Sequence, residues 1–221
     1  MNILKINLKW LIFLFYHVKV FSRKLRKKWL KMRIILASAS PRRKELLGYI
    51  TNDFEVIVSN ADETVEETST IQEQSKKIAY LKAKDVFEKT QGNRIVIGSD
   101  TLVLKNGKHY GKPKSREEAI QMISELQNDV HEVITSICVL VEKNNQIDEY
   151  IDYDITKVYL SEITQKEIEE WIDSGEAMDK AGAYAIQGQF SKFITKFEGS
   201  YNSVVGLPVQ KLYKAIKQYL D

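Results

Sequence analysis

Apolar and polar positions along the chain predict strands and helices in alternation. Residues 34–37 form a short continuous apolar run, and residues 94–98 form another, of the kind that is buried on both faces of a sheet. Other segments rich in Val, Ile, Leu, Phe and Tyr predict strands at 101–104, 108–110, 131–143, 149–160 and 193–197. Helical spacing of apolar residues predicts helices at about 42–49, 70–90 and 209–220.

Polar residues at the borders of these segments supply start and turn signals. Ser40 followed by Pro41 suits the first turn of a helix. Ser115 and Thr164 each precede a glutamate by three residues, which predicts a capping box and a helix after each. Asn106-Gly107 between two strand segments indicates a hairpin. The chain is therefore expected to be an α/β domain, with a mixed sheet because of the hairpin.

The bulk composition fits one domain without a disulfide framework. With 221 residues and 43% hydrophobic content, the chain can bury one good-sized core. Its single cysteine, Cys138, lies in an apolar run and is expected to be a small buried side chain rather than a metal ligand.

The formal charge of +3 is unevenly distributed. Residues 1–31 contain nine of the 33 Lys and Arg residues and no acidic residue, so the remaining chain has 24 basic and 30 acidic side chains. A broad nucleic-acid-binding face would leave a basic excess there. Nucleic acid is therefore not an expected partner, and any anion site should be a small local pocket.

The segment 1–31 is set apart from the rest by composition. Its apolar run at 10–16 is too short to span a bilayer, and no small-residue cleavage site follows. One interpretation is a basic, aromatic helix lying on anionic lipid. The break at Met32 favours another, in which 1–31 is upstream sequence read in frame. We expect a domain at 32–221 without membrane contact, and a cytoplasmic location.

Three cations begin the first helix of this domain. Cations in a first turn oppose the helix dipole, by a few tenths to about 1 kcal/mol each, and so favour a bound anion. Free backbone N–H groups, two hydroxyls and two guanidinium groups together suit a phosphate, although a solvated basic helix start would look similar. The residues are Ser38, Ser40, Arg42, Arg43 and Lys44.

Four further charged residues are candidates for a polyphosphate and metal site. Asp100, expected at the end of an apolar strand, suits a metal ligand or a base toward water, and equally an Asx turn. Lys82 and Lys112 are candidates for neutralising phosphate oxygens, although most lysines are solvated. Glu63 is a candidate second metal carboxylate, although its acidic stretch is also typical of an exposed loop.

A glycine-rich stretch from 175 to 206 supplies the last candidate. Five of the ten glycines fall there, which indicates tight turns or backbone close to a ligand. The amide of Gln187 offers a donor and an acceptor that suit the N3–H and O4 edge of uracil or thymine. A buried glutamine paired with backbone is the alternative.

Six segments follow one another along the chain at characteristic spacing: 35–47, Gly98-Ser99-Asp100-Thr101, Gly111-Lys112-Pro113, His131-Glu132-Val133, 179–188 and Val204-Val205-Gly206-Leu207-Pro208. In this order they resemble the signatures of the Maf family. The resemblance covers residues 33 to about 220, with a departure at 126–129, where Asn128 and Asp129 can still form the usual turn.

The resemblance implies an elongated α/β fold with a central cleft, like the inosine triphosphate pyrophosphatases, and a nucleoside triphosphate substrate. It implies Asp100 as the proton acceptor, and a divalent cation, Mg²⁺ or Mn²⁺, on Asp100 and Glu63. The implied base-specificity residues are Arg42, Thr101 and Gln187. The implied phosphate-binding residues are Ser38, Ser40, Arg43, Lys82 and Lys112.

The motif at 183–188 resembles the branch of the family that hydrolyses dTTP and UTP to the monophosphate and pyrophosphate. The 7-methyl-GTP branch is the alternative substrate class, and a nucleotide-binding regulator of cell division without turnover is the alternative function. For the assembly, the prevalence of two-fold symmetric oligomers makes a homodimer the expectation.

Overall fold

The computed structural model describes residues 32–65 and 69–220, so the expectations for 1–31 lie outside the described residues. One seven-stranded sheet forms its centre, in the order β2-β1-β3-β5-β6-β7, with β4 paired to β3. The pairs β1/β2 and β1/β3 are parallel and the others antiparallel. The strands are β1 (Arg33–Leu36), β2 (Glu55–Val56), β3 (Arg94–Lys105), β4 (Lys108–Tyr110), β5 (Val130–Lys143), β6 (Gln146–Leu160) and β7 (Ile194–Glu198).

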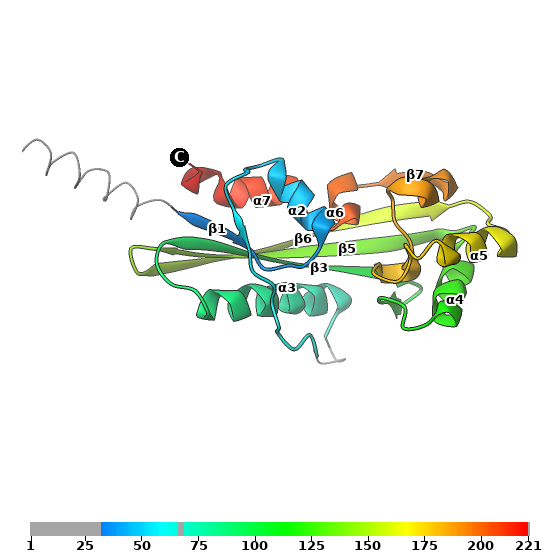
Figure 1. Cartoon of the computed structure of the whole chain (residues 1–221), viewed down its shortest axis with the longest axis horizontal. Coiled ribbons are helices and arrows are strands. Elements are labelled where there is room, and N and C mark those ends of the chain that lie inside the picture. Colours follow the sequence, from blue (N-terminus) through cyan, green and yellow to red (C-terminus); the bar gives the residue numbers. More distant parts are fainter. Residues whose placement is uncertain (1–31, 66–68, 221) are drawn as a thin grey trace, which may run out of the picture.

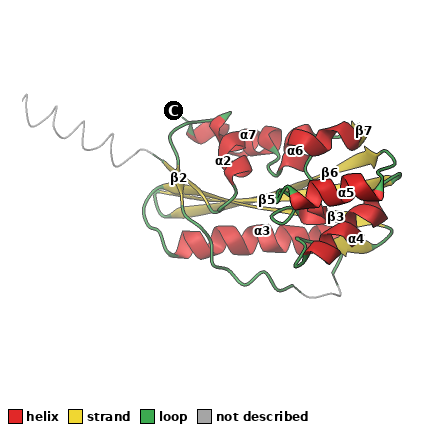
Figure 2. Ribbon diagram, turned by 45° about the vertical axis from the view of Figure 1, so that its right-hand side comes forward, coloured by secondary structure: helices red, strands yellow, loops and turns green. Residues whose placement is uncertain are grey.

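Helices cover both faces of this sheet and one end of it (Figure 1). α3 runs along one face, while α2, α6 and α7 lie on the other, and α4 and α5 pack together at one end (Figure 2). The mixed α/β fold predicted from the sequence is confirmed. The helices are α2 (Pro41–Gly48), α3 (Ile71–Glu88), α4 (Arg116–Leu126), α5 (Gln165–Asp173), α6 (Tyr201–Val205) and α7 (Val209–Ile216), with 3-10 turns η1 (Ala181–Ala183), η2 (Gly188–Phe193) and η3 (Lys217–Tyr219).

The predicted helix caps and turns form as expected, with one exception. Ser40 accepts a hydrogen bond from the N–H of Arg43, and Thr164 forms the complete predicted capping box. At Ser115 only half of the box forms, because the carboxylate of Glu118 accepts from the N–H of Lys114 instead. The predicted hairpin forms at Asn106, whose φ is 51°, and the turn at Asn128 adopts φ 52°.

Asp100 does not end a strand, and this corrects the sequence prediction. The apolar run at 94–98 continues as β3 to Lys105, and the antiparallel ladder with β5 pairs Asp100 with Ser136. An Asx turn is therefore excluded, because the backbone at Asp100 belongs to a regular strand. The predicted break was wrong because Gly98 looks like a strand end in sequence, whereas it lies inside the ladder opposite Cys138.

Gly98 sets the spacing between β3 and α3. A Cβ at Gly98 would lie 2.2 Å from the carbonyl oxygen of Ala79 and 2.8 Å from the nitrogen of Ala83. The backbones of helix and strand are thus in direct contact. The buried face of α3 is accordingly made mostly of small residues, and Leu81 is only partly buried. This close packing places Lys82 of α3 beside Asp100, which follows Gly98 by two residues on β3.

No helix among the described residues is long and apolar enough to cross a membrane.

Candidate functional site

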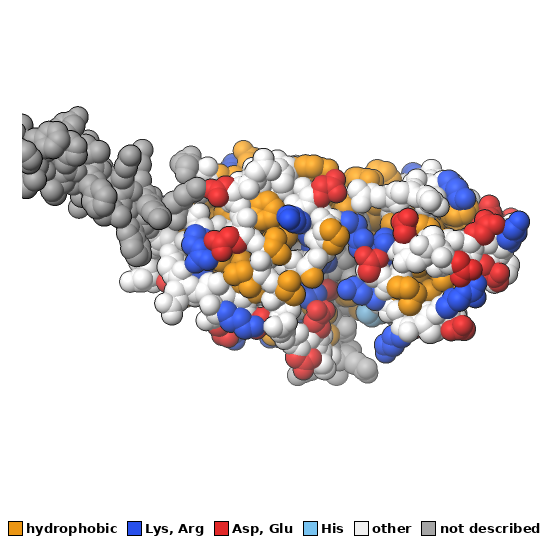
Figure 3. Space-filling view, viewed as in Figure 1, with side chains coloured by type: hydrophobic (Ala, Val, Ile, Leu, Met, Phe, Trp, Pro, Cys, Tyr) orange, Lys and Arg blue, Asp and Glu red, His pale blue; other side chains and the backbone are white. Residues whose placement is uncertain are grey.

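A cavity of about 400 Å³ opens where α2, α3, β3 and the 179–187 segment meet. Lys and Arg side chains gather in the middle of the face shown in Figure 3. Nine of the ten predicted site residues line this cavity, and Ser38 lines an adjoining cavity of about 300 Å³ that shares several of them. The nine are Ser40, Arg42, Arg43, Glu63, Lys82, Asp100, Thr101, Lys112 and Gln187.

Arg43 is held by oxygen atoms at each of its side-chain nitrogens. Its Nε donates to the carbonyl of Gly206 at 2.9 Å, its Nη2 to the hydroxyl of Thr101 at 3.2 Å and its Nη1 to that of Ser38 at 3.4 Å. Burial lowers the pKa of the guanidinium, although Asp100 opposes the shift. An arginine stays charged despite such a shift, so Arg43 presents a fixed cation to the cavity.

The Gly206 carbonyl that orients Arg43 is itself held in place. It also accepts from the buried hydroxyl of Ser99 at 3.0 Å, and Gly206 adopts φ 131°, which favours glycine. The residue belongs to the glycine-rich stretch in which the sequence predicted backbone near a ligand. The specific contact with Arg43, 163 residues away, could not be derived from the sequence.

Lys82 lies between two carboxylates. Its Nζ is 2.9 Å from Oδ1 of Asp100 and 3.0 Å from Oε2 of Glu63. The side chains of Lys82 and Asp100 are 13% and 8% exposed, whereas that of Glu63 is 56% exposed. The described part of the acidic stretch, residues 62–65, therefore lies in a surface loop, but Glu63 reaches from it into the site.

The chemistry of the two carboxylates fits a divalent cation. The second oxygen of Asp100, Oδ2, is buried without a hydrogen-bond partner. Glu63 and Asp100 both contact the ammonium group of Lys82, so the two carboxylates lie close together. Within residues 32–65 and 69–220, no group of three or more metal-ligating side chains comes together. Two carboxylates completed by water and phosphate oxygens is the donor set that Mg²⁺ takes in nucleotide sites.

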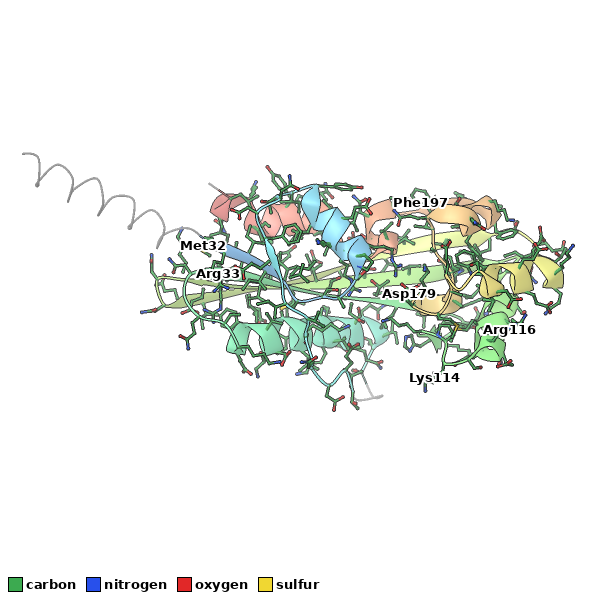
Figure 4. The ribbon with its side chains drawn as sticks, in the orientation of Figure 1. Met32, Arg33, Lys114, Arg116, Asp179 and Phe197 are labelled. Atoms are coloured by element: carbon green, nitrogen blue, oxygen red, sulfur yellow. The ribbon has the colours of Figure 1, made fainter. Side chains whose placement is uncertain are left out.

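The opposite wall of the cavity belongs to the 179–187 segment. Asp179 is labelled in Figure 4. It pairs with Arg42, with Nη1 of Arg42 and Oδ2 of Asp179 3.2 Å apart. Partial burial acts to raise the pKa of Asp179, but Lys180 and Arg42 together keep it below its usual value. The amide of Gln187 makes no hydrogen bond within the described part of the chain, so its donor and acceptor are free for a ligand.

Asp179, His109 and Tyr184 are among the lining residues that were not predicted as site residues. Asp179 partners Arg42, His109 lines the cavity from β4, and the Tyr184 ring forms part of the wall. Tyr184 is fixed by His131, whose Nε2 lies 2.6 Å from the phenol oxygen. The sequence marked Asp179, Tyr184 and His131 only through the family motifs in which they lie. Nothing in the sequence marked His109 as a site residue.

A helix start with two hydroxyls, several cations and two carboxylates around one cavity is the kind of site, in an α/β protein, that suits a polyanionic ligand. The model of the family described as Maf-like protein matches residues 33–219. The chain belongs to the Maf family.

Named relatives match the chain over most of its length. A protein of Alkaliphilus metalliredigens named dTTP/UTP pyrophosphatase is 46% identical over 187 residues, which cover 85% of this chain and 96% of the relative. A Clostridium acetobutylicum protein of the same name is 45% identical, covering 84% and 96%. A solved HAM1 protein from Coxiella burnetii overlaps with TM-score 0.44 and 14% identity, covering 85% of this chain and 99% of that one.

Proposed function

We propose that this protein is a nucleoside triphosphate pyrophosphatase that cleaves dTTP and UTP between the α and β phosphates. The products are the nucleoside monophosphate and pyrophosphate. One observation carries the proposal: the Asp100 carboxylate shares a cavity with Arg43 and Lys82, so a base and two cations meet at one place. The relatives named dTTP/UTP pyrophosphatase, 41–46% identical over most of their length, support the substrate class.

In the proposed reaction Asp100 accepts a proton from water. The water oxygen bonds to the α-phosphorus, and the bond from that phosphorus to the bridging oxygen breaks, so that pyrophosphate leaves with the electron pair. The unpartnered Oδ2 of Asp100 is the oxygen available to receive the proton. General-base assistance of this kind contributes about 10²–10⁴-fold to a rate.

The cations of the cavity stabilise negative charge on the triphosphate. Arg43 is already oriented, so it loses little freedom when it binds a phosphate oxygen. Ser38 and Ser40 add hydroxyl groups at the start of α2, and Lys82 and Lys112 add ammonium groups. Asp100 and Glu63 would hold Mg²⁺ or Mn²⁺, which when bound supplies positive charge to the phosphates.

We assign recognition of the base to Gln187, Arg42 and Thr101. The free amide of Gln187 suits the imide edge of uracil or thymine, and Arg42 and Thr101 line the same cavity. A 7-methylguanine base presents a different edge, and the relatives' names favour the pyrimidine branch over the 7-methyl-GTP branch.

The direct test is pyrophosphate release by the purified protein from a panel of nucleoside triphosphates, including dTTP, UTP and 7-methyl-GTP. We expect turnover of dTTP and UTP at rates well above those of purine nucleotides. A protein that binds these nucleotides without releasing pyrophosphate would instead be the non-catalytic regulator. Preference for 7-methyl-GTP would move the chain to the other branch.

Four further predictions accompany this function: a Maf-like nucleotide pyrophosphatase domain at 32–221, a cytoplasmic location, a homodimer and dependence on Mg²⁺ or Mn²⁺. A chain that starts at Met32 should keep full activity and lose any binding to anionic vesicles that the whole chain has. Light scattering of the same two proteins measures the assembly, and chelation followed by metal addition measures the cation requirement.

A further inference from the structure

The ammonium group of Lys82 stands where two negative charges converge. It is within hydrogen-bond distance of both Asp100 and Glu63, and its side chain is largely buried. These are the same two carboxylates assigned to the divalent cation. A divalent ion on both carboxylates would therefore lie beside a positive charge, and at such distances like charges repel strongly in a partly buried site.

Lys82 contacts both carboxylates and is also able to leave them. Arg43 is fixed by three oxygen partners on different elements. Lys112 is exposed and makes no ion pair with Asp100 or Glu63. Lys82 is joined to α3 by a flexible four-carbon stem, and its ammonium can exchange carboxylate oxygens for phosphate oxygens at small conformational cost.

We propose that Lys82 is the internal counter-ion of Asp100 and Glu63, and that a triphosphate is needed to draw it away. The ligand of the site is then the complex of divalent cation and nucleotide, because the phosphates offer Lys82 new partners as the cation takes its old ones. The free cation alone binds weakly. This inference rests on the proposed function and specifies the form in which the substrate enters.

The test measures Mn²⁺ binding to the full chain without nucleotide, from the loss of the free-ion signal in electron paramagnetic resonance. The wild-type protein should bind Mn²⁺ weakly, at roughly millimolar concentrations. Lys82→Met, which keeps the stem and removes the charge, should bind at least tenfold more tightly. Lys112→Met is the matched control, since it removes a cavity cation that touches neither carboxylate, and it should change the affinity by less than about threefold.

A double variant shows whether the gain in Mn²⁺ affinity depends on Asp100. Adding Asp100→Asn to Lys82→Met should abolish the increase, because the released carboxylate would be lost. Equal Mn²⁺ affinity in the wild type and Lys82→Met, or an equal gain in Lys112→Met, would overturn the inference. If Lys82→Met does not fold, Lys82→Gln replaces it, and micromolar Mn²⁺ binding by the wild type alone also overturns the inference.

The Mn²⁺ titration and the test of pyrophosphate release can fail independently of each other. No nucleotide is present in the titration, so Mn²⁺ affinity does not depend on turnover. An active enzyme whose wild-type protein binds free Mn²⁺ tightly would contradict only the counter-ion role. If the protein released no pyrophosphate but Lys82→Met gained Mn²⁺ affinity, the counter-ion role of Lys82 would stand and the proposed nucleotide substrate would be wrong.

Discussion

The two walls of the cavity are built differently. The inner wall, defined as Arg43, Lys82 and Asp100, stands on two helices and the central strand. The outer wall, the segment 179–187, contains one short 3-10 turn and otherwise irregular backbone, with positive φ at Gly182 and Ala183. The inner wall is cross-linked by hydrogen bonds and ion pairs, whereas Gln187 on the outer wall has a free amide.

This contrast suggests a division of labour. Chemical steps require side chains held to within a fraction of an ångström, which regular elements provide. Recognition of a base tolerates more variation and is commonly carried by loops on a rigid scaffold. Changes in the inner wall should therefore reduce turnover, and changes in the outer wall should alter substrate binding. The following experiments test that division, from the largest expected effect to the smallest.

Asp100→Asn should cause the largest loss. Removing the proton acceptor is expected to lower kcat for pyrophosphate release by at least about 10²-fold, since that is the usual scale of general-base assistance. Circular dichroism checks that the variant is folded. Asp179→Asn on the outer wall is the control and should reduce kcat by less than about tenfold. A folded Asp100→Asn enzyme with normal turnover would refute the role of Asp100.

Gly98→Ala should produce the largest loss of stability, because its Cβ would collide with the backbone of α3. Overpacking of this kind costs about 1–3 kcal/mol, which corresponds to a decrease in Tm of about 3–10 °C for a domain of this size. Gly48→Ala is the control, since the neighbouring side-chain atom nearest to its Cβ would be Oδ1 of Asn52, at 3.8 Å. Equal Tm values for the two variants would show that α3 and β3 are not tightly packed.

His131 couples stability to pH, because it joins the sheet to the outer wall through Tyr184. Burial lowers the pKa of His131 to about 4, so the folded protein keeps the ring neutral while the unfolded chain gains a proton below pH 6.5. The free energy of unfolding should therefore fall as the pH decreases from 6.5 toward 4, by on the order of 2 kcal/mol at pH 5.

The measurement is the Tm of the wild type and of His131→Phe between pH 7 and pH 5. The variant should show a smaller decrease, because it has no ring to protonate in the unfolded state. Carboxylates contribute to both proteins alike, so the difference between the two curves isolates His131. Parallel curves would mean that the native ring takes up a proton as readily as the unfolded chain.

Gln187→Ala should have the smallest effect and should act on binding. Loss of a hydrogen bond to the base is expected to raise KM for dTTP and UTP about 3–10-fold, with little change in kcat. Gln189→Ala is the matched control, because Gln189 is exposed and lies outside the cavity lining. A fall in kcat with unchanged KM would assign Gln187 to the inner wall's role instead.

Much of the fold was predictable from local signals. The start of α2 at Ser40 and Pro41, the hairpin at Asn106 and the strands β5 and β6 follow from capping, turn geometry and apolar spacing within a few residues. The continuation of β3 through Asp100 was missed, because Gly98 and Ser99 resemble a strand end unless the partner strand and helix are known.

The site divides in the same way. The sequence by itself determined which residues carry charge and hydroxyl groups, and the order of its motifs indicated the Maf family, since residue types and their spacing are properties of the chain. Only the tertiary structure decided that the Arg43 guanidinium binds the Gly206 carbonyl and that Lys82 bridges Asp100 and Glu63. Such contacts join residues far apart in the chain, and their geometry depends on how α2 and α3 pack against the sheet.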